Sequence, residues 1–432
     1  PSVSASVLID KVAKFQDWLP AVSFLKARVS WANVGKDTTP YSISYGYTAT
    51  AFPGGYRPAA TYPNYYLKPE NVETWEAGLE AKFLKNRIGV DIALYQSDVT
   101  DQIYDVPYDY ITGAKYYTTN VGLIRNKGIE IALNFTPIKT KDWKWTIGIN
   151  ASRNIGVLKR MYDGWNNDNP FQEDYGTTIG SRLFVYDYVG KKMGELWGLG
   201  LKQAPEGSFY LDENGNQVDC SGMDIINAKT GLPALDDSSN LKYYGNVNPD
   251  WLGGLTTSLK WRDITLNATF TGQIGGKTAS VTAGILGYQG KLKNTLEGRN
   301  DGFVAPGVNA IKAADGSITY QKNNTITTDI VSYYSTYKAN RYNFEEYIYD
   351  NSFFKLKELT VSYNFPKKLM EKTKVIQGIT VSAYATNLFC ITNYPFYDPE
   401  VTGYVGSNTK RGIESGSLPM TRSFGANIKI RF

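Results

Sequence analysis

Apolar and polar residues alternate along segment after segment of this chain. The last nine residues show the pattern clearly, because Phe424, Ala426, Ile428, Ile430 and Phe432 share one parity while polar or small residues occupy the other. A period of two places successive side chains on opposite faces of a β-strand. We therefore expect an all-β protein whose strands each have one apolar and one polar face.

Ten further segments repeat this period, at residues 3–9, 25–31, 75–83, 88–94, 129–135, 143–151, 255–261, 264–272, 353–365 and 379–385. The segment 353–365 is irregular, because Lys355 and Lys357 share the parity of its apolar residues. A lysine that faces lipid costs about 2 to 4 kcal/mol at the bilayer midplane and about 0 to 1 kcal/mol near the interface. We therefore expect both lysines at a membrane edge.

The connections between these segments alternate in length. Short ones at 84–87, 136–142, 262–263 and 366–378 separate long ones at 34–74, 97–128, 152–250, 274–352 and 386–421. Outer-membrane barrels have short turns at one end and long loops at the other, whereas long structureless loops are rare in compact soluble domains. The pattern predicts a transmembrane antiparallel β-barrel with long extracellular loops. Because an unpaired strand edge is not viable in lipid, these roughly eleven strands would belong to a larger barrel.

In such a barrel the polar parity lines the lumen and the apolar parity contacts lipid. The predicted lumen-lining residues are Lys26, Arg28, Glu76, Glu80, Lys82, Asp91, Glu130 and Lys144. The predicted lipid-facing residues include Val90, Ile131, Leu266, Ile428 and Phe432. Large aromatic residues near the predicted strand ends suit the lipid–water boundary; they are Trp31, Tyr95, Trp143, Trp251, Trp261 and Tyr363.

Composition excludes several kinds of active site. The chain has no His and a net charge of only +5, so His-based catalysis, His metal ligands and a polyphosphate-binding role for nucleic acid find no support. Its two Cys residues, Cys220 and Cys390, are too far apart in sequence for a metal-binding motif, and we expect both to be unpaired. We expect no cofactor and no enzymatic activity.

Carboxylate pairs are the remaining candidates for chemistry, because two carboxylates can hydrolyse a glycoside. Three pairs lie close in sequence: Asp212 with Glu213, Glu345 with Glu346, and Asp398 with Glu400. We expect all of them to be solvated loop residues. The stretch 212–216 lacks the further acidic ligands of a calcium loop, so no metal site is expected. It is instead predicted to form a type I′ hairpin turn between short strands at 208–211 and 217–219.

The longest connection, 152–250, is the expected place for ligand contact. Its candidate substrate-binding residues are Trp165, Asn166, Asp168 and Tyr175, which combine aromatic rings with an amide and a carboxylate. The ring of Trp165 is expected to be exposed. Tyrosine-rich stretches at 108–117 and 393–397 could stack on sugar rings or on peptide side chains, or could pack the loops against one another.

The chain as a whole resembles the SusC/RagA family of TonB-dependent outer-membrane transporters. The resemblance is carried, in order, by PSVSAS, FLKARVSWANVGKD, LKPENVETWEAGLEA, NVGLIRNKGIEIAL, YGNVNPDWLGGLTTSLKW, FFKLKELTVSYNFPKKLM, SAYATNLFCITNYPFYDPEV and a last strand that ends in Phe432. The family's barrel has roughly 22 strands, so the resemblance implies that residues 1–432 are its second half. The plug domain, the TonB box and the first barrel strands would not be in this chain.

The resemblance also implies a function. The whole protein would sit in the bacterial outer membrane and import oligosaccharides or oligopeptides, energised by TonB, with a SusD-like surface lipoprotein as its lid. Pairs of transporter and lipoprotein often dimerise in this family. Two alternatives remain open from the residues alone: a passive outer-membrane porin, and a secreted carbohydrate-binding β-protein.

Overall fold

A computed structural model describes residues 1–12, 19–38, 40, 43–109, 111, 113–162, 165, 167–168, 170–172, 183–237, 240–338, 343, 345–371, 375–395, 398–401 and 411–432. Its main feature is a twelve-stranded sheet. Eleven strands follow one another in antiparallel order, β1-β2-β6-β7-β8-β9-β16-β17-β24-β25-β27, and the short β5 is the twelfth, pairing in parallel with β8. Each of the eleven predicted segments falls in one strand of this path to within one residue, so the predicted all-β fold is confirmed.

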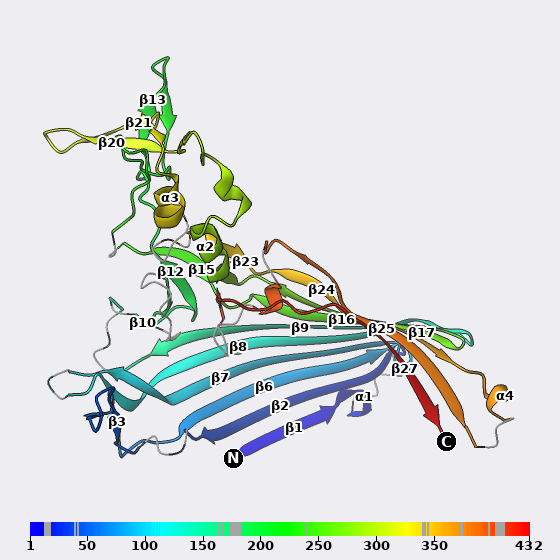
Figure 1. Cartoon of the computed structure of the whole chain (residues 1–432). Coiled ribbons are helices and arrows are strands. Elements are labelled where there is room, and N and C mark those ends of the chain that lie inside the picture. The colour runs from blue at the N-terminus through cyan, green and yellow to red at the C-terminus, as the bar shows by residue number, and fades with distance from the viewer. Residues whose placement is uncertain are drawn as a thin grey trace.

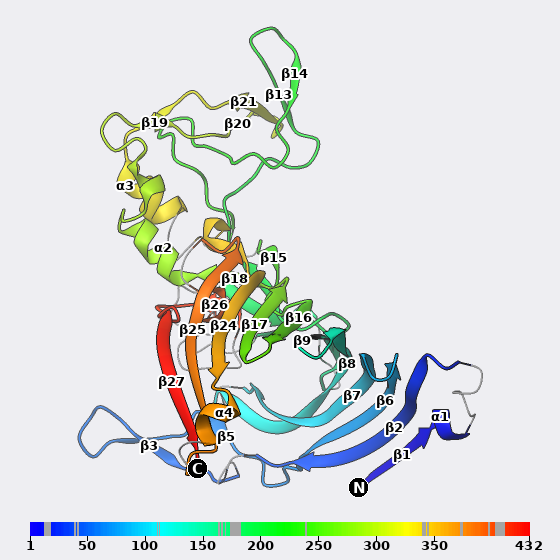
Figure 2. The ribbon, with the colours of Figure 1, turned by 90° about the vertical axis from the view of Figure 1, so that its right-hand side faces the viewer.

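The strands of the main path follow one another around a curved wall (Figures 1 and 2). Their bounds are Ser2–Leu8 (β1), Val22–Lys36 (β2), Glu70–Phe83 (β6), Ile88–Pro107 (β7), Tyr116–Lys139 (β8), Trp143–Arg160 (β9), Trp251–Trp261 (β16), Ile264–Ile274 (β17), Phe353–Asn364 (β24), Gly378–Thr392 (β25) and Ser423–Arg431 (β27). In the described part of the chain β1 pairs only with β2 and β27 only with β25, so the wall is an open sheet.

Two tight turns that join neighbouring strands use left-handed backbone. Leu84, Lys85 and Asn86 have φ of 51°, 56° and 63° between β6 and β7, and Arg262 has φ of 50° between β16 and β17. Asn tolerates this conformation better than most residues, and short connections suit antiparallel neighbours. The predicted turns at 84–87 and 262–263 are therefore confirmed.

The predicted long connection at 97–128 is wrong. β7 continues to Pro107 and β8 begins at Tyr116, so the two strands remain paired well past the predicted strand ends. A strand of 24 residues such as β8 is far longer than the 9 to 11 tilted residues that cross a bilayer. Outside lipid neither face must be apolar, so the period of two disappears from the sequence although the strand continues.

The long connections fold into a second part that rises from the wall (Figure 2). Nearest the wall are a four-stranded sheet of order β10-β11-β12-β15 and a three-stranded sheet of order β23-β18-β26. Their bounds are Phe171–Gln172 (β10), Leu183–Asp187 (β11), Glu195–Gly198 (β12), Lys242–Asn246 (β15), Lys277–Ser280 (β18), Ile348–Asp350 (β23) and Ile413–Glu414 (β26). They share a buried core that includes Val185, Leu196, Ala279, Tyr347 and Ile413.

Farther from the wall a four-stranded sheet of order β14-β13-β21-β20 forms the tip. The remaining strands are Tyr47–Ala49 (β3), Tyr56–Pro58 (β4), Thr61–Tyr62 (β5), Phe209–Leu211 (β13), Gln217–Asp219 (β14), Phe303–Val304 (β19), Val308–Lys312 (β20), Ile318–Lys322 (β21) and Ile326–Thr327 (β22). The helices are Ile9–Val12 (α1), Val281–Tyr288 (α2), Ile330–Ser332 (α3) and Lys367–Met370 (α4), with 3₁₀ turns Lys293–Leu296 (η4), Glu345–Tyr347 (η6) and Pro399–Val401 (η8) and the π-turn Tyr333–Lys338 (η5).

The hairpin of β13 and β14 confirms the predicted strand pair but not the predicted turn type. Gly215 N–H donates to Asp212 O at 3.0 Å, and Gly215 alone has a positive φ, of 81°. The Asp212 carboxylate accepts from the backbone of Asn214 and Asn216 at 2.9 and 2.8 Å. A type I′ turn needs two positive φ angles, so the five-residue loop with its Asp cap replaces the predicted turn.

Candidate functional site

The register of the wall separates its residues into two faces. Directly opposed residues of an antiparallel pair lie on one face, and Lys26 pairs with Glu80, which pairs with Asp91. When the pairing is followed from β2 to β9, all eight predicted lumen-lining residues lie on this face, which we call the polar face. Their contact with a lumen stays a prediction.

Charges on the polar face are paired with one another. Arg28 donates to Asp91 through both terminal nitrogens, at 3.1 and 2.8 Å, and its Nε lies 3.5 Å from Glu76 Oε1. Lys82 Nζ lies 2.9 Å from Glu80 Oε1. The bidentate geometry fixes the Arg28 guanidinium across three neighbouring strands.

Aliphatic residues occupy the opposite face, which we call the apolar face. Val90 pairs with Ala81 and Leu133, and Leu266 pairs with Leu259 and Val361. Ile131 and Ile428 lie on this face, and Phe432 follows the end of β27. Ile428 is 66% exposed, which a soluble sheet would rarely leave in contact with water. Contact of this face with lipid stays a prediction.

Aromatic pairs lie at two levels of the wall. Trp143 stacks on Trp261 at 5.7 Å beside the short turns. Trp31 lies opposite Trp75, and both indole nitrogens donate to Glu73, at 3.0 and 3.2 Å. Two such levels fit the interfacial belts of a barrel.

A register shift in β24 explains the two irregular lysines. The pairing of β24 with both neighbours slips between Leu356 and Glu358, so that Lys355 lies on the polar face opposite Thr271 and Cys390. Its Nζ lies 2.5 Å from Asp398 Oδ2 and 3.1 Å from Glu400 Oε2, while Lys357 Nζ lies 2.8 Å from Glu400 Oε1. The bulge turns Lys355 away from the apolar face, and the expected position of both lysines at a membrane edge stays a prediction.

The same contacts correct the expectation of solvated carboxylate pairs. Asp398 is buried with Lys355, Glu345 lies 3.5 Å from Lys242 Nζ, and Glu346 lies 2.9 Å from Lys338 Nζ. Glu346 and Asp224 raise the pKa of Lys338 against the opposing effect of burial. These carboxylates hold loops together, because each neutralises a lysine that the fold partly removes from water. Asp212 remains exposed as the turn cap.

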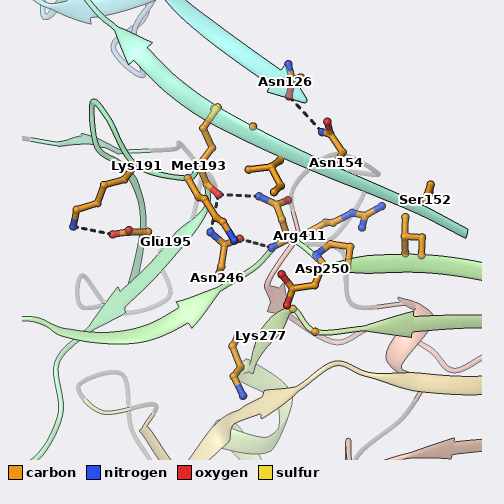
Figure 3. Close-up of a pocket in the computed structure, with 18 of the residues that line it drawn as sticks. Asn126, Ser152, Asn154, Lys191, Met193, Glu195, Asn246, Asp250, Lys277 and Arg411 are labelled. Atoms are coloured by element: carbon orange, nitrogen blue, oxygen red, sulfur yellow. Dashed lines mark hydrogen bonds and ion pairs between the residues drawn. The ribbon is translucent and has the colours of Figure 1, made fainter. Parts of the chain in front are cut away.

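A cavity of about 930 Å³ lies where the wall meets the rising loops (Figure 3). The wall contributes Asn126 from β8, Ser152, Asn154 and Gly156 from β9, and Leu252 from β16. The register places these five residues on the polar face. The cavity therefore opens on the side of the wall that carries Arg28 and Asp91.

Loop residues form the other side of the cavity, and they are mostly amides and charged groups. The side-chain amides of Asn246 and Asn248 both donate to Met193 O, at 2.8 and 3.0 Å. Lys191 Nζ lies 3.7 Å from Glu195, and Lys277 Nζ lies 3.5 Å from Asp350. Lys192, Asp250 and Arg411 complete the charged lining. This arrangement can offer many hydrogen-bond donors and acceptors to a polar ligand.

Of the predicted ligand residues in this loop, Trp165 and Asp168 are not among the residues that line the cavity. Trp165 was expected to be exposed, which is wrong: it is half-buried, packs on the cluster of Val121, Ile124, Leu158 and Met161, and makes an edge-on contact with Tyr162 at 5.3 Å. The apolar ends of β8 and β9 attract the ring. Asp168 is exposed, and its role stays a prediction. Asn166 and Tyr175 lie outside the described residues.

Tyrosines of the stretch 108–117 pack against one another. Tyr108 stacks on Tyr117 at 5.4 Å, and Tyr117 lies 6.4 Å from Tyr62. Tyr394, from the other tyrosine-rich stretch, is buried edge-on against Tyr349 at 5.6 Å. These rings join loops, which is the second of the two roles considered from the sequence.

The sequence did not identify the residues of the cavity, although one signal was present. Asn246, Asn248 and Asp250 belong to the segment YGNVNPDW, which resembles the family without alternating. Both Cys residues are free, as predicted. In the described ranges no group of three or more His, Cys, Asp or Glu could hold a metal, and no helix there is long and apolar enough to cross a bilayer.

The curved, open antiparallel sheet with paired charges on one face and aliphatic residues on the other defines a class, the outer-membrane β-barrels. Within it, residues 4–388 match the family described as TonB dependent receptor-like, beta-barrel, and the chain belongs to this family. The predicted barrel class and the SusC/RagA resemblance are confirmed. The family is an outer-membrane family of receptors.

Relatives and solved structures agree with this family assignment. TonB-dependent receptor P3 of Formosa agariphila is 25% identical over 86% of this chain and 35% of its own length. TonB-dependent receptor SusC of Bacteroides thetaiotaomicron is 25% identical over 95% of this chain and 38% of its own. The RagAB peptide importer in the closed-closed state superposes with a TM-score of 0.68 at 19% identity, over 99% of this chain and 43% of that chain. The chain thus spans well under half the length of these proteins.

Proposed function

We propose that the whole protein to which this chain belongs is an active importer of oligosaccharides or oligopeptides in the bacterial outer membrane. The cavity carries this proposal, because it joins the polar face of the wall to the loops and is lined by amides and paired charges. A nutrient captured by the loops would then enter a polar lumen. The barrel performs no bond chemistry and needs no cofactor in this account.

The family supports a proposal about the partners. SusC is named as TonB-dependent, and RagAB is titled a peptide importer. We propose that TonB energises this protein through a part outside the chain, and that a SusD-like lipoprotein covers the loops as a lid. Outer-membrane lipid would contact the apolar face, and two transporter–lipoprotein pairs would form a dimer.

Uptake with and without a proton gradient separates active import from a passive porin. Cells that express the full-length protein should accumulate a fluorescent oligosaccharide or oligopeptide, and a protonophore should abolish that accumulation. Accumulation that persists after the protonophore would favour the porin. Recovery of the protein in buffer, rather than in the detergent extract of outer membranes, would instead favour a secreted binding protein.

A further inference from the structure

Five aromatic side chains line one side of the small sheet next to the cavity. In the register, Phe184 of β11 lies opposite Trp197 of β12, and Trp197 lies opposite Tyr243 of β15. Tyr186 shares their side, because it is two residues from Phe184 in the same strand. Tyr188 follows β11. We call these five residues the aromatic face.

The rings form one continuous series. Phe184 stacks on Tyr186 at 5.3 Å with an interplanar angle of 10°. Tyr186 lies 6.3 Å from Tyr188, Tyr188 lies 5.7 Å from Trp197, and Trp197 lies 5.4 Å from Tyr243. The series thus places five aromatic rings next to one another on one surface.

Core packing does not account for these rings. The opposite side of the same strands carries Leu183, Val185 and Leu196, which are 9%, 1% and 0% exposed and belong to the buried core. The aromatic residues are only partly buried, and Tyr243 is 53% exposed. The sheet therefore keeps an aliphatic side for folding and an accessible aromatic side.

The aromatic face continues into the cavity. Tyr243, Glu195 and Lys191 line the cavity, and Figure 3 shows Lys191 and Glu195 paired at its edge. Lys191 Nζ lies 4.5 Å from the centre of the Tyr188 ring and 5.8 Å from that of Trp197, while the Trp197 indole N–H donates to Glu195 at 3.0 Å. One surface thus offers ring faces beside fixed polar groups.

The charge of the cavity is nearly balanced. Four cationic side chains (Lys191, Lys192, Lys277 and Arg411) and three acidic ones (Glu195, Asp250 and Asp350) line it. Lys191 and Lys277 already have carboxylate partners within the lining. An uncharged ligand therefore suits the site better than one that brings ionised ends, because neither sign of charge clearly prevails in the lining.

We infer that the aromatic face and the cavity together form a binding site for a neutral oligosaccharide. The apolar faces of sugar rings would pack on Trp197 and Tyr243, and the sugar hydroxyls would bond to the amides and charged groups of the cavity. This inference rests on the proposed function and narrows its cargo from two classes to one.

Calorimetric titration of sugars into the complex of the full-length protein with its proposed partner lipoprotein tests the inference. The probes are maltohexaose, cellohexaose, xylohexaose, mannohexaose and laminarihexaose, with a tryptic digest of casein for comparison. At least one hexasaccharide should bind, and Tyr243→Ala combined with Trp197→Ala should weaken that binding about tenfold or more, since two stacking contacts are lost.

Two further variants guard against a folding artefact. Tyr243→Ala alone changes an exposed ring, and it should fold normally and still weaken binding. Phe209→Ala removes a ring that is 47% exposed on the distant hairpin, and it should leave affinity unchanged. Binding of the casein peptides alone, binding of none of the probes, or equal affinity in the wild type and the Tyr243→Ala variant would overturn the inference.

Uptake distinguishes failure of the inference from failure of the proposed function. Protonophore-sensitive uptake of casein peptides without hexasaccharide binding would reject the sugar site and keep the importer. Hexasaccharide binding with protonophore-insensitive uptake would keep the sugar site and reject active import.

Discussion

Lys355 and Asp398 form a buried ion pair, with 2.5 Å between Nζ and Oδ2 and side chains only 3% and 8% exposed. The bulge in β24 points the lysine to the polar face, and the carboxylate arrives from the connection between β25 and β27. The pair therefore fixes a loop to the wall, and its loss should destabilise both the loop and the wall.

Lys355→Met should destabilise the protein by about 3 to 5 kcal/mol, because it leaves the Asp398 carboxylate buried without its partner. Urea unfolding in detergent, followed by tryptophan fluorescence, measures the change. Lys36→Met is the matched control, since Lys36 is 70% exposed in its pair with Glu70 and should matter little. Equal effects of the two variants would contradict the role of burial.

The carboxyl of Asp187 should make the stability of the sheet β10-β11-β12-β15 depend on pH. Burial raises the pKa of its carboxyl to about 6, Glu195 adds to the rise, and the N–H of Gly194, which donates to Oδ1 at 2.7 Å, opposes it. The unfolded chain loses this proton at a lower pH than the folded chain does. The free energy of unfolding should therefore fall as pH rises from about 4 to about 6, by at most about 3 kcal/mol.

Hydrogen exchange of residues 194–198 at pH 4, 5 and 7, corrected for intrinsic rates, measures this loss of protection. Asp187→Asn has no carboxyl to titrate and should remove the decline. A wild-type profile that is flat, or that rises with pH, would contradict the assignment.

A side chain at position 412 should disturb the structure next to the cavity. Its φ is 87°, and a Cβ there would lie 2.1 Å from Cγ1 of Val247. Its carbonyl accepts from Ala279 N at 2.8 Å, which ties β18 to the residue after Arg411. Gly412→Ala should therefore displace Arg411, lower the thermal midpoint and weaken ligand binding.

Gly416→Ala provides the control. Gly416 also has a positive φ, of 68°, but nothing lies within 4 Å of an added Cβ. It should carry only the left-handed backbone penalty of about 1 to 2 kcal/mol and leave ligand affinity unchanged. Calorimetric affinities and thermal midpoints compare the two variants, and equal ligand affinities would contradict the role of Gly412.

The wall could be predicted from the sequence because lipid would impose the period of two. The residues that pair with Leu266 and Val90 are aliphatic for the same reason, and the period of two predicts their strands correctly. The period fails where that constraint ends, so it does not predict the outer halves of β7 and β8. It also fails at the β24 bulge, because one extra residue exchanges the faces and gives Lys355 the wrong parity.

The candidate site was less predictable. The cavity collects residues from Asn126 to Arg411, and tertiary packing alone brings them together. Trp165 is of a residue type that often contacts ligands, but it packs against an apolar cluster. The residue type alone does not predict that packing. The aromatic face depends on which of two β11 parities packs inward, and both contain apolar residues.

Spin labels at adjacent positions of β17 test most directly whether the two faces of the wall meet lipid and water. Leu266 lies on the apolar face and Asn267 on the polar face. In a full-length background with every native cysteine, Cys220 and Cys390 included, changed to Ser, single cysteines at 266 and 267 carry the label in liposomes. The label at 266 should collide mainly with oxygen, which dissolves in lipid, and the label at 267 with a water-soluble nickel chelate. The reverse order, or equal collision with both reagents, would contradict the account.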